Sequence, residues 1–438
     1  MSEKDAIIPI IKMSEVNEKI SIYSGEMTIE NEEGCKIKLD GEISLDWLPQ
    51  PRISFVGESF DKEASNLNLL EEEVTLTTSY GSQYIVLLTN IISGSKTKNK
   101  IAGFIIKELE REPQQIDSLY FSVVNFVNFH GDSIKQNEFL YRGRITFEYG
   151  NYIITLDKLP NYESNYEELK KNGGFIITHV GTINHRDGNP FNYEEIRDLL
   201  TGLTYLLSFA RGSHVGICSI HGYLEEELKL SKYQTPLINS WKEQQNWFPR
   251  SSSDRILEDL YPALIDKMRD SLWEKVLKQA FTWYFDSHTS TYTETKIISV
   301  QVALEMLAWT FLVEENEIIE ESYYVNKLKA SDKIRRLLDG LSIPRGILDI
   351  SQFNSLNGAY EDGAHLLTDV RNKIIHPKRI TSQGDEFHQS MYLVSNLGRK
   401  YLELCILKIL GYEGVYQNLL NGSQWIGENL EQVPWSDQ

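Results

Sequence analysis

The sequence predicts an α+β protein in which a β-rich N-terminal region precedes an all-α helical bundle. Three observations predict this class. Short segments rich in Ile, Val, Tyr and Phe, separated by turn residues, fill most of the first third of the chain. From Asp254 onward, the apolar residues recur with a helical period. Of the 438 residues, 41% are hydrophobic and 11% are aromatic, so each part can bury a core of its own.

Residues 1–230 are expected to form an antiparallel sandwich or barrel joined to a small α/β piece. Turn residues such as Ser93–Ser95 and Tyr149–Asn151 separate the expected strands. These strands are Lys19–Tyr23, Met27–Glu30, Cys35–Leu39, Tyr84–Leu88, Ile101–Ile106, Leu119–Val124, Arg142–Tyr149 and Tyr152–Leu156. The α/β piece comprises a strand over Gly174–Gly181, a helix over Asn192–Arg211 and a strand over Val215–Ile220.

Residues 231–253 have little periodicity and are interpreted as a linker. Residues 254–412 then form the helical bundle, with Asp254 as the expected N-cap of its first helix. The expected helices are Asp254–Asp270, Ser271–Asp286, Thr295–Val313, Val325–Leu338, Glu361–His376 and Glu386–Leu410. Several helices in a row without strands are typical of a bundle. Residues 413–438 are interpreted as an acidic tail.

The cysteines and the N-terminus predict a cytoplasmic protein that does not cross a membrane. The chain has only three cysteines, an odd number, which argues against a disulfide-stapled secreted protein. The first residues lack the basic and apolar regions of a signal peptide. Polar residues interrupt the longest apolar stretch, Ile297–Val313, so we expect a buried core helix there.

The net charge of −19 disfavours non-specific binding to nucleic acid, because a polyanion is repelled at long range. Any contact with RNA must therefore come from a local basic patch. One window is strongly basic and free of acidic residues: it contains Arg371, Lys373, Lys378 and Arg379. We expect Lys373, Lys378 and Arg379 to contact RNA if the chain binds it.

The segment Arg371–His376, of sequence Arg-Asn-Lys-Ile-Ile-His, lies in this window. An Arg and a His close together suit the metal-independent cleavage of RNA, in which the ribose 2′-hydroxyl attacks the neighbouring phosphate. Histidine can accept and donate the proton near neutral pH. Arginine can hold the phosphate and its developing charge. We therefore expect His376 to act as general acid/base and Arg371 as phosphate clamp, with no metal and no cofactor.

The helical geometry places these two residues apart. Five residues along a helix turn by about 500°, so Arg371 and His376 would lie roughly 140° apart. Pro377 disfavours a helical conformation for the residue before it, so His376 is expected at the last turn or just beyond it. Asn372, four residues before His376, could orient its ring. Glu305 lies in an apolar helix and is the expected ion-pair partner of Arg371.

The Arg-Asn-x-x-x-His pattern resembles the signature of HEPN-domain ribonucleases. The upstream helix around Ala303–Leu307, which carries Glu305, is also similar to that family. A β-rich region before such a domain resembles the Apea-like HEPN proteins of bacterial anti-phage defence, or abortive infection. The resemblance implies a homodimer whose motif helices face each other. It also implies an endoribonuclease that leaves 2′,3′-cyclic phosphates on RNA, which could be tRNA, and an N-terminal region that senses a phage-derived trigger.

Simpler interpretations stand beside this one. Arg371 and His376 could be an ordinary helix-end pair, and Glu305 a structural residue. The bundle could be a catalytically silent module for dimerisation or RNA binding, or it could transfer nucleotides to a partner protein. His179, His185 and Asp187 lack a fourth ligand at useful spacing, so a metal site there is disfavoured.

Overall fold

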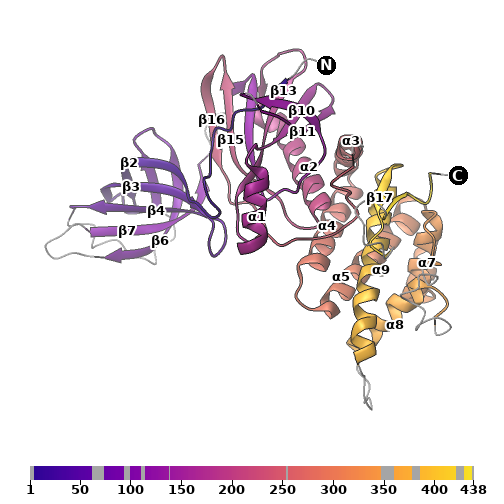
Figure 1. The fold of residues 1–438 in the computed structure, drawn as a ribbon. Coiled ribbons are helices and arrows are strands. Elements are labelled where there is room, and N and C mark those ends of the chain that lie inside the picture. The colour runs from indigo at the N-terminus through magenta and orange to yellow at the C-terminus, as the bar shows by residue number, and fades with distance from the viewer. Residues whose placement is uncertain are drawn as a thin grey trace.

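The computed structural model describes residues 4–61, 74–92, 99–109, 114–137, 139–252, 255–346, 360–376, 385–420 and 429–436. It confirms the predicted fold class. A six-stranded barrel and an eight-stranded sheet form the N-terminal part, and a mainly helical part follows. In Figure 1, the barrel, the sheet with its helices and the helical part lie in a row from left to right.

The barrel is closed by six strands in the order β2-β3-β4-β7-β6-β5. They are β2 (Ile20–Glu30), β3 (Lys36–Asp46), β4 (Arg52–Ser59), β5 (Val74–Thr78), β6 (Gln83–Ile92) and β7 (Asn99–Glu108). Alternating apolar side chains such as Ile29, Ile37 and Phe55 point inward and form a core separate from that of the rest of the chain. Two of the expected strands merge into the single long strand β2.

The second sheet has the order β1-β10-β11-β12-β13-β9-β15-β16. Its strands are β1 (Lys4–Asp5), β9 (Ser118–Val124), β10 (Asp132–Gln136), β11 (Phe139–Tyr149), β12 (Tyr152–Lys158), β13 (Ile177–His185), β15 (Gly216–Leu224) and β16 (Glu227–Tyr233). The short strands β8 (Gln115–Ile116) and β14 (Phe191–Asn192) pair with each other. Helices α1 (Tyr162–Asn172) and α2 (Tyr193–Arg211) complete this region. β1 pairs with β10. In the sequence, the barrel strands therefore lie between β1 and the other strands of the same sheet.

The sheet and the helical part share one hydrophobic core. Residues 234–252, most of the segment interpreted as a linker, form no helix or strand, but they are packed: Trp241 and Trp247 are both buried. Trp247 donates a 3.1 Å hydrogen bond to the carbonyl oxygen of Phe209 at the end of α2. The first helix after this segment, α3 (Ile256–Arg269), packs against α2 and β11. The expected N-cap Asp254 lies outside the described residues.

The helical part continues with α4 (Trp273–Thr289), α5 (Thr293–Trp309), the π-helical turn η2 (Thr310–Glu315), α6 (Glu321–Asn326), α7 (Ala330–Gly340), α8 (Gly363–Ile375) and α9 (Asp385–Ile409). By length and composition alone, Thr293–Glu315 could cross a membrane. Its helix α5 instead packs against α4, α7, α8 and α9, with Ile297 and Leu304 fully buried. The C-terminal segment adds a hairpin of β17 (Val415–Gln417) and β18 (Leu430–Gln432).

Candidate functional site

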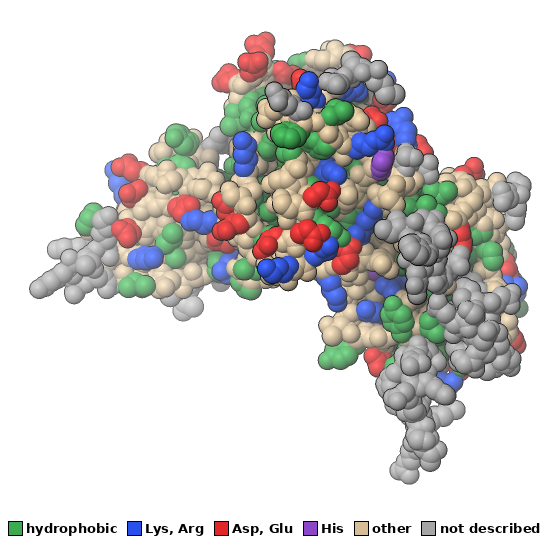
Figure 2. Space-filling model, viewed as in Figure 1, with side chains coloured by type: hydrophobic (Ala, Val, Ile, Leu, Met, Phe, Trp, Pro, Cys, Tyr) green, Lys and Arg blue, Asp and Glu red, His purple; other side chains and the backbone are tan. Residues whose placement is uncertain are grey.

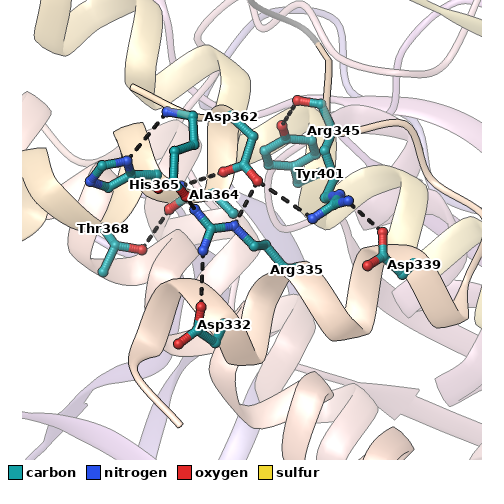
Figure 3. A network of polar contacts seen from close by, with 10 residues as sticks. Asp332, Arg335, Asp339, Arg345, Asp362, Ala364, His365, Thr368 and Tyr401 are labelled. Atoms are coloured by element: carbon teal, nitrogen blue, oxygen red, sulfur yellow. Dashed lines mark hydrogen bonds and ion pairs between the residues drawn. The ribbon is translucent and has the colours of Figure 1, made fainter. Parts of the chain in front are cut away.

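The candidate site lies on α8, which is fixed at its N-terminal end by a network of ion pairs (Figure 3). Asp362 caps the helix by accepting a 2.8 Å hydrogen bond from the backbone N–H of His365. The same carboxylate accepts a 2.7 Å hydrogen bond from Arg335 on α7 and lies 3.6 Å from Arg345. Partial burial raises the pKa of Asp362, but the hydrogen bonds from Arg335 and His365 outweigh it and leave that pKa below its usual value.

One face of α8 anchors it in the core. Leu366, Leu367 and Val370 are buried, and Ile374 packs against the same cluster. The polar motif residues lie on the remaining surface. Arg371 is partly buried, whereas Asn372 and His376 are exposed.

The three motif residues are connected through Asn372. Arg371 donates from Nη1 to the side-chain oxygen Oδ1 of Asn372 at 3.2 Å. The backbone N–H of His376 donates to the carbonyl oxygen of Asn372 at 2.9 Å. His376 has φ −117° and ψ 68°, so it lies just beyond the last helical residue, as predicted from the proline that follows. Among the described residues, neither the Arg371 guanidinium nor Asn372 forms a hydrogen bond to the His376 ring.

The structure does not contain the ion pair expected between Glu305 and Arg371, both of which it describes. Glu305 accepts a 2.8 Å hydrogen bond from Gln301, one turn earlier on α5, and it is partly exposed. Although α5 and α8 are in contact, no ion pair joins Glu305 to Arg371 in the described part of the chain. A partner on the same helix holds the carboxylate at little entropic cost, so Glu305 does not fix the guanidinium. The Nε atom of Arg371 is buried and has no partner among the described residues.

Of the three basic residues expected to contact RNA, the structure describes only Lys373. Lys373 forms a 2.7 Å ion pair with Asp369 and approaches the Tyr360 hydroxyl at 3.3 Å. The hydrogen bond to Asp369 raises the pKa of Lys373 and also compensates its charge. Lys378 and Arg379 lie outside the described residues.

A buried polar cluster that was not predicted from the sequence lies between α4 and α9. Tyr284 donates a 2.8 Å hydrogen bond to Oε1 of Glu403. Arg399 donates to Nδ1 of His288 at 3.0 Å, and Nε2 of His288 lies 3.8 Å from the same Glu403 oxygen. Burial raises the pKa of Glu403 to about 7 and lowers that of His288 well below its usual value.

This cluster has the groups of an acid–base site but little space. A carboxylate that titrates near neutrality beside a neutral histidine is typical of general acid–base catalysis. The adjoining cavity has a volume of only about 10 Å³, which is room for one water molecule at most. Two polar pairs at i, i+4 within apolar helices, Tyr284 with His288 and Arg399 with Glu403, could have revealed the cluster in the sequence.

The two histidines considered for a metal site lie in different surroundings. His179 is fully buried between Phe126, Phe129 and Tyr162, and burial lowers its pKa well below its usual value. His185 lies at the exposed end of β13, where its Nδ1 accepts a hydrogen bond from a turn amide. In the part of the chain that the structure describes, no three His, Cys, Asp or Glu side chains could hold a metal ion.

Two family models match this chain. Residues 111–244, which hold most of the second sheet, match the YopA central domain, and residues 270–431 match the YopA C-terminal domain. The SPbeta prophage-derived uncharacterized protein YopA of Bacillus subtilis (strain 168) is 37% identical over 441 residues, which cover 96% of each chain. No solved structure matches.

Proposed function

The chain belongs to the YopA family, and we propose that its helical part is a metal-independent HEPN endoribonuclease that acts in anti-phage defence. The observation that carries this proposal is the end of α8. There, the Arg371 side chain and the His376 backbone N–H both donate hydrogen bonds to Asn372, and His376 is exposed. These are the two kinds of side chain that RNA cleavage without a metal requires.

In the proposed reaction, His376 accepts the proton of the ribose 2′-hydroxyl. The resulting oxygen nucleophile attacks the adjacent phosphorus, the bond to the 5′-oxygen breaks, and that oxygen takes the proton from the imidazolium of His376 that formed in the first step. The products are a 2′,3′-cyclic phosphate and a 5′-hydroxyl. Arg371 holds the phosphate and stabilises its additional negative charge. Asn372 positions Arg371 through the 3.2 Å hydrogen bond.

We further propose that the enzyme is a homodimer with composite sites. Within one chain, Arg371 and His376 contact different atoms of Asn372 and form no hydrogen bond with each other. If the ends of two α8 helices face each other around a two-fold axis, Arg371 of one protomer meets His376 of the other. Ile375, beside His376, is 39% exposed and would be covered by such an interface.

The defence role rests on the domain order and on the relative. The Bacillus subtilis protein is described as prophage-derived, and a resident prophage gains when its host resists other phages. We propose the same setting for this chain, with activity on cytoplasmic RNA such as tRNA. The barrel and the second sheet would then detect a phage-derived trigger, and Lys378 and Arg379 would contact the RNA.

The test incubates wild type, Arg371→Ala and His376→Ala with total RNA and tRNA in the presence of EDTA. His365→Ala and Arg336→Ala are the matched controls, because they remove a histidine from α8 and an exposed arginine from α7. We expect cleavage with cyclic phosphate ends by wild type and both controls only. Wild type purified from phage-challenged cells is assayed in the same way. If it binds RNA without cutting it, the silent binding module is favoured instead.

A mixing experiment tests the composite site. A heterodimer of Arg371→Ala and His376→Ala retains one intact site if each site takes its Arg and His from different protomers. An equal mixture of the two inactive variants, unfolded and refolded together, should then recover about a quarter of the wild-type activity, because about half of the dimers are mixed. No recovery would contradict the composite site, while leaving the assignment of the two residues to the variants tested separately.

A further inference from the structure

A second site lies far from α8 in the sequence, in the region of the second sheet. A pocket of about 380 Å³ opens where β12 leads into α1, and residues 128–130 and 250–251 close it on other sides. This volume is within the range of pockets that hold small organic ligands. Neither the proposed ribonuclease chemistry nor the motif on α8 uses this pocket.

The pocket gathers positive charge in a strongly acidic protein. Four basic residues line it, His130, Arg142, Lys158 and Arg250, and the lining itself contains the carboxylate of Glu163, while Glu243 pairs with Arg250 from outside the lining. Elsewhere, basic and acidic side chains are interspersed over the face seen in Figure 2. Basic side chains brought together from four places in the sequence raise the local potential, and an anion bound among them would offset their repulsion.

Two of these basic residues, Arg142 and Lys158, lack a strong ionic partner. The Arg142 guanidinium contacts the His130 ring and forms no ion pair with any described carboxylate. The Lys158 side chain is only 12% exposed, and its ammonium group donates to Asn128 at 2.9 Å. The nearest carboxylate, Glu163, lies 3.5 Å away and is largely in solvent. Burial lowers the pKa of Lys158, as expected for a cation that is incompletely compensated.

The pocket also presents aromatic rings and an unused hydroxyl group. The ring of Tyr162 stacks on that of Tyr166 with centroids 5.9 Å apart, and Phe129 lies on another part of the lining. Tyr162 is 1% exposed, yet its hydroxyl has no hydrogen-bond partner among the described residues. A buried hydroxyl without a partner is costly unless a ligand or water supplies one.

The first turn of α1 contributes backbone donors. Tyr162, the first residue of this helix, donates its own N–H to Leu159, and no side chain caps the N–H groups that follow it. Free N–H groups and the positive end of the helix dipole favour a phosphate at such a position. Cations, helix amides and stackable rings around one cavity are the groups that recognise a phosphate attached to an aromatic base.

We propose that this pocket binds a nucleoside phosphate, with the phosphates held by Arg142, Lys158 and the start of α1, and the base stacked on the aromatic lining. The Tyr162 hydroxyl donates to the ligand. Glu163 competes with the phosphates for Lys158. This site is independent of the proposed ribonuclease site, and a nucleotide bound here would be a means of regulating the full chain.

The test measures binding of ATP, GTP, AMP, adenosine and inorganic phosphate to the full-length protein by calorimetry. We expect at least one nucleotide to bind at least 10-fold more tightly than adenosine or phosphate alone. Arg142→Ala, at an exposed position, should weaken binding at least 10-fold, and Glu163→Gln should strengthen it. Arg186→Ala, which removes an exposed ion pair with Glu148 on the same sheet, is the matched control and should change nothing.

Tyr162→Phe tests whether the Tyr162 hydroxyl binds the ligand or whether the residue has only a structural role. Removal of the unpaired hydroxyl should leave the unliganded protein as stable as wild type or more so, while reducing the nucleotide-induced rise in Tm. The proposal is overturned if no nucleotide binds at millimolar concentration. It is equally overturned if phosphate alone binds as tightly as the nucleotides, or if Arg142→Ala and Arg186→Ala bind alike.

Discussion

His376 lies one residue beyond the end of α8 and remains attached to it by a 2.9 Å hydrogen bond from its backbone N–H to the carbonyl oxygen of Asn372. The side chain of Asn372 accepts a second hydrogen bond, from Arg371. One residue thus positions both members of the motif, the histidine through its backbone and the arginine through its side chain. A change that displaces α8 should therefore disturb the arginine and the histidine together, whereas a substitution of Asn372 removes only the side-chain contact with Arg371.

Asp362→Ala should destabilise the protein. The substitution removes the N-cap of α8 and the carboxylate that pairs with Arg335. We expect a loss of about 2 kcal/mol in the free energy of unfolding, which urea denaturation would measure. Glu361→Gln is the control: it pairs with the same arginine but is 74% exposed, so it should cost less than about 0.5 kcal/mol. Equal effects of the two substitutions would show that the network does not hold α8.

Glu403→Gln should stabilise the protein relative to wild type, and this gain in stability should be larger at pH 8 than at pH 5. Burial raises the pKa of Glu403 to about 7 in the folded state, above its unfolded value, so folding favours the protonated form. The cost of ionising this carboxyl appears as the pH rises from about 4.5 to 7, and glutamine avoids it while still accepting from Tyr284. Thermal unfolding at both pH values tests this expectation, with Glu274→Gln on the exposed face of α4 as control. A larger gain at pH 5 would contradict it.

The wild-type protein should lose stability as the pH falls from 6.5 towards 4. Burial lowers the pKa of four histidines, that of His214 to about 4; the others are His179, His221 and His288. The unfolded chain binds their protons first, so stability is present above pH 6.5 and decreases below it. Denaturant unfolding between pH 7.5 and 4.5 would measure the slope. His185→Gln at the exposed end of β13 should leave the slope unchanged, and a flat profile for wild type would contradict the prediction.

Local patterns predicted much of the fold, whereas pairing between distant segments could not be predicted. The helical period located α3, α4, α8 and α9 to within a few residues, because each buries an apolar stripe, and a long apolar run located α5, which is buried on most sides. The closure of the barrel depends on contacts between strands far apart in sequence, such as β2 with β5. Helix α1 was missed because only three of its residues are buried, which leaves a weak apolar stripe.

The candidate site shows the same division. The position of His376 followed from a local rule, the effect of proline on the residue before it. The partner of Arg371 depended on side-chain competition across two helices, and there Gln301 holds Glu305 on its own helix. The i, i+4 spacing of Gln301 and Glu305 is a local signal for this contact. The Tyr284 and Glu403 cluster carries a signal of the same kind, because its polar pairs interrupt apolar helices.

Asn372→Asp should abolish most RNA cleavage while the fold is retained. Asn372 is exposed, so the substitution should change the free energy of unfolding by less than about 0.5 kcal/mol. The new carboxylate would pair with Arg371 and compensate the charge that is proposed to hold the phosphate. We expect kcat/KM on tRNA to fall at least about 100-fold, the effect of losing one strong electrostatic contact in a transition state. Asn372→Ser can still accept a hydrogen bond and adds no charge. Its kcat/KM should fall by about 10-fold or less. If both variants cleave at the wild-type rate, Arg371 does not hold the phosphate.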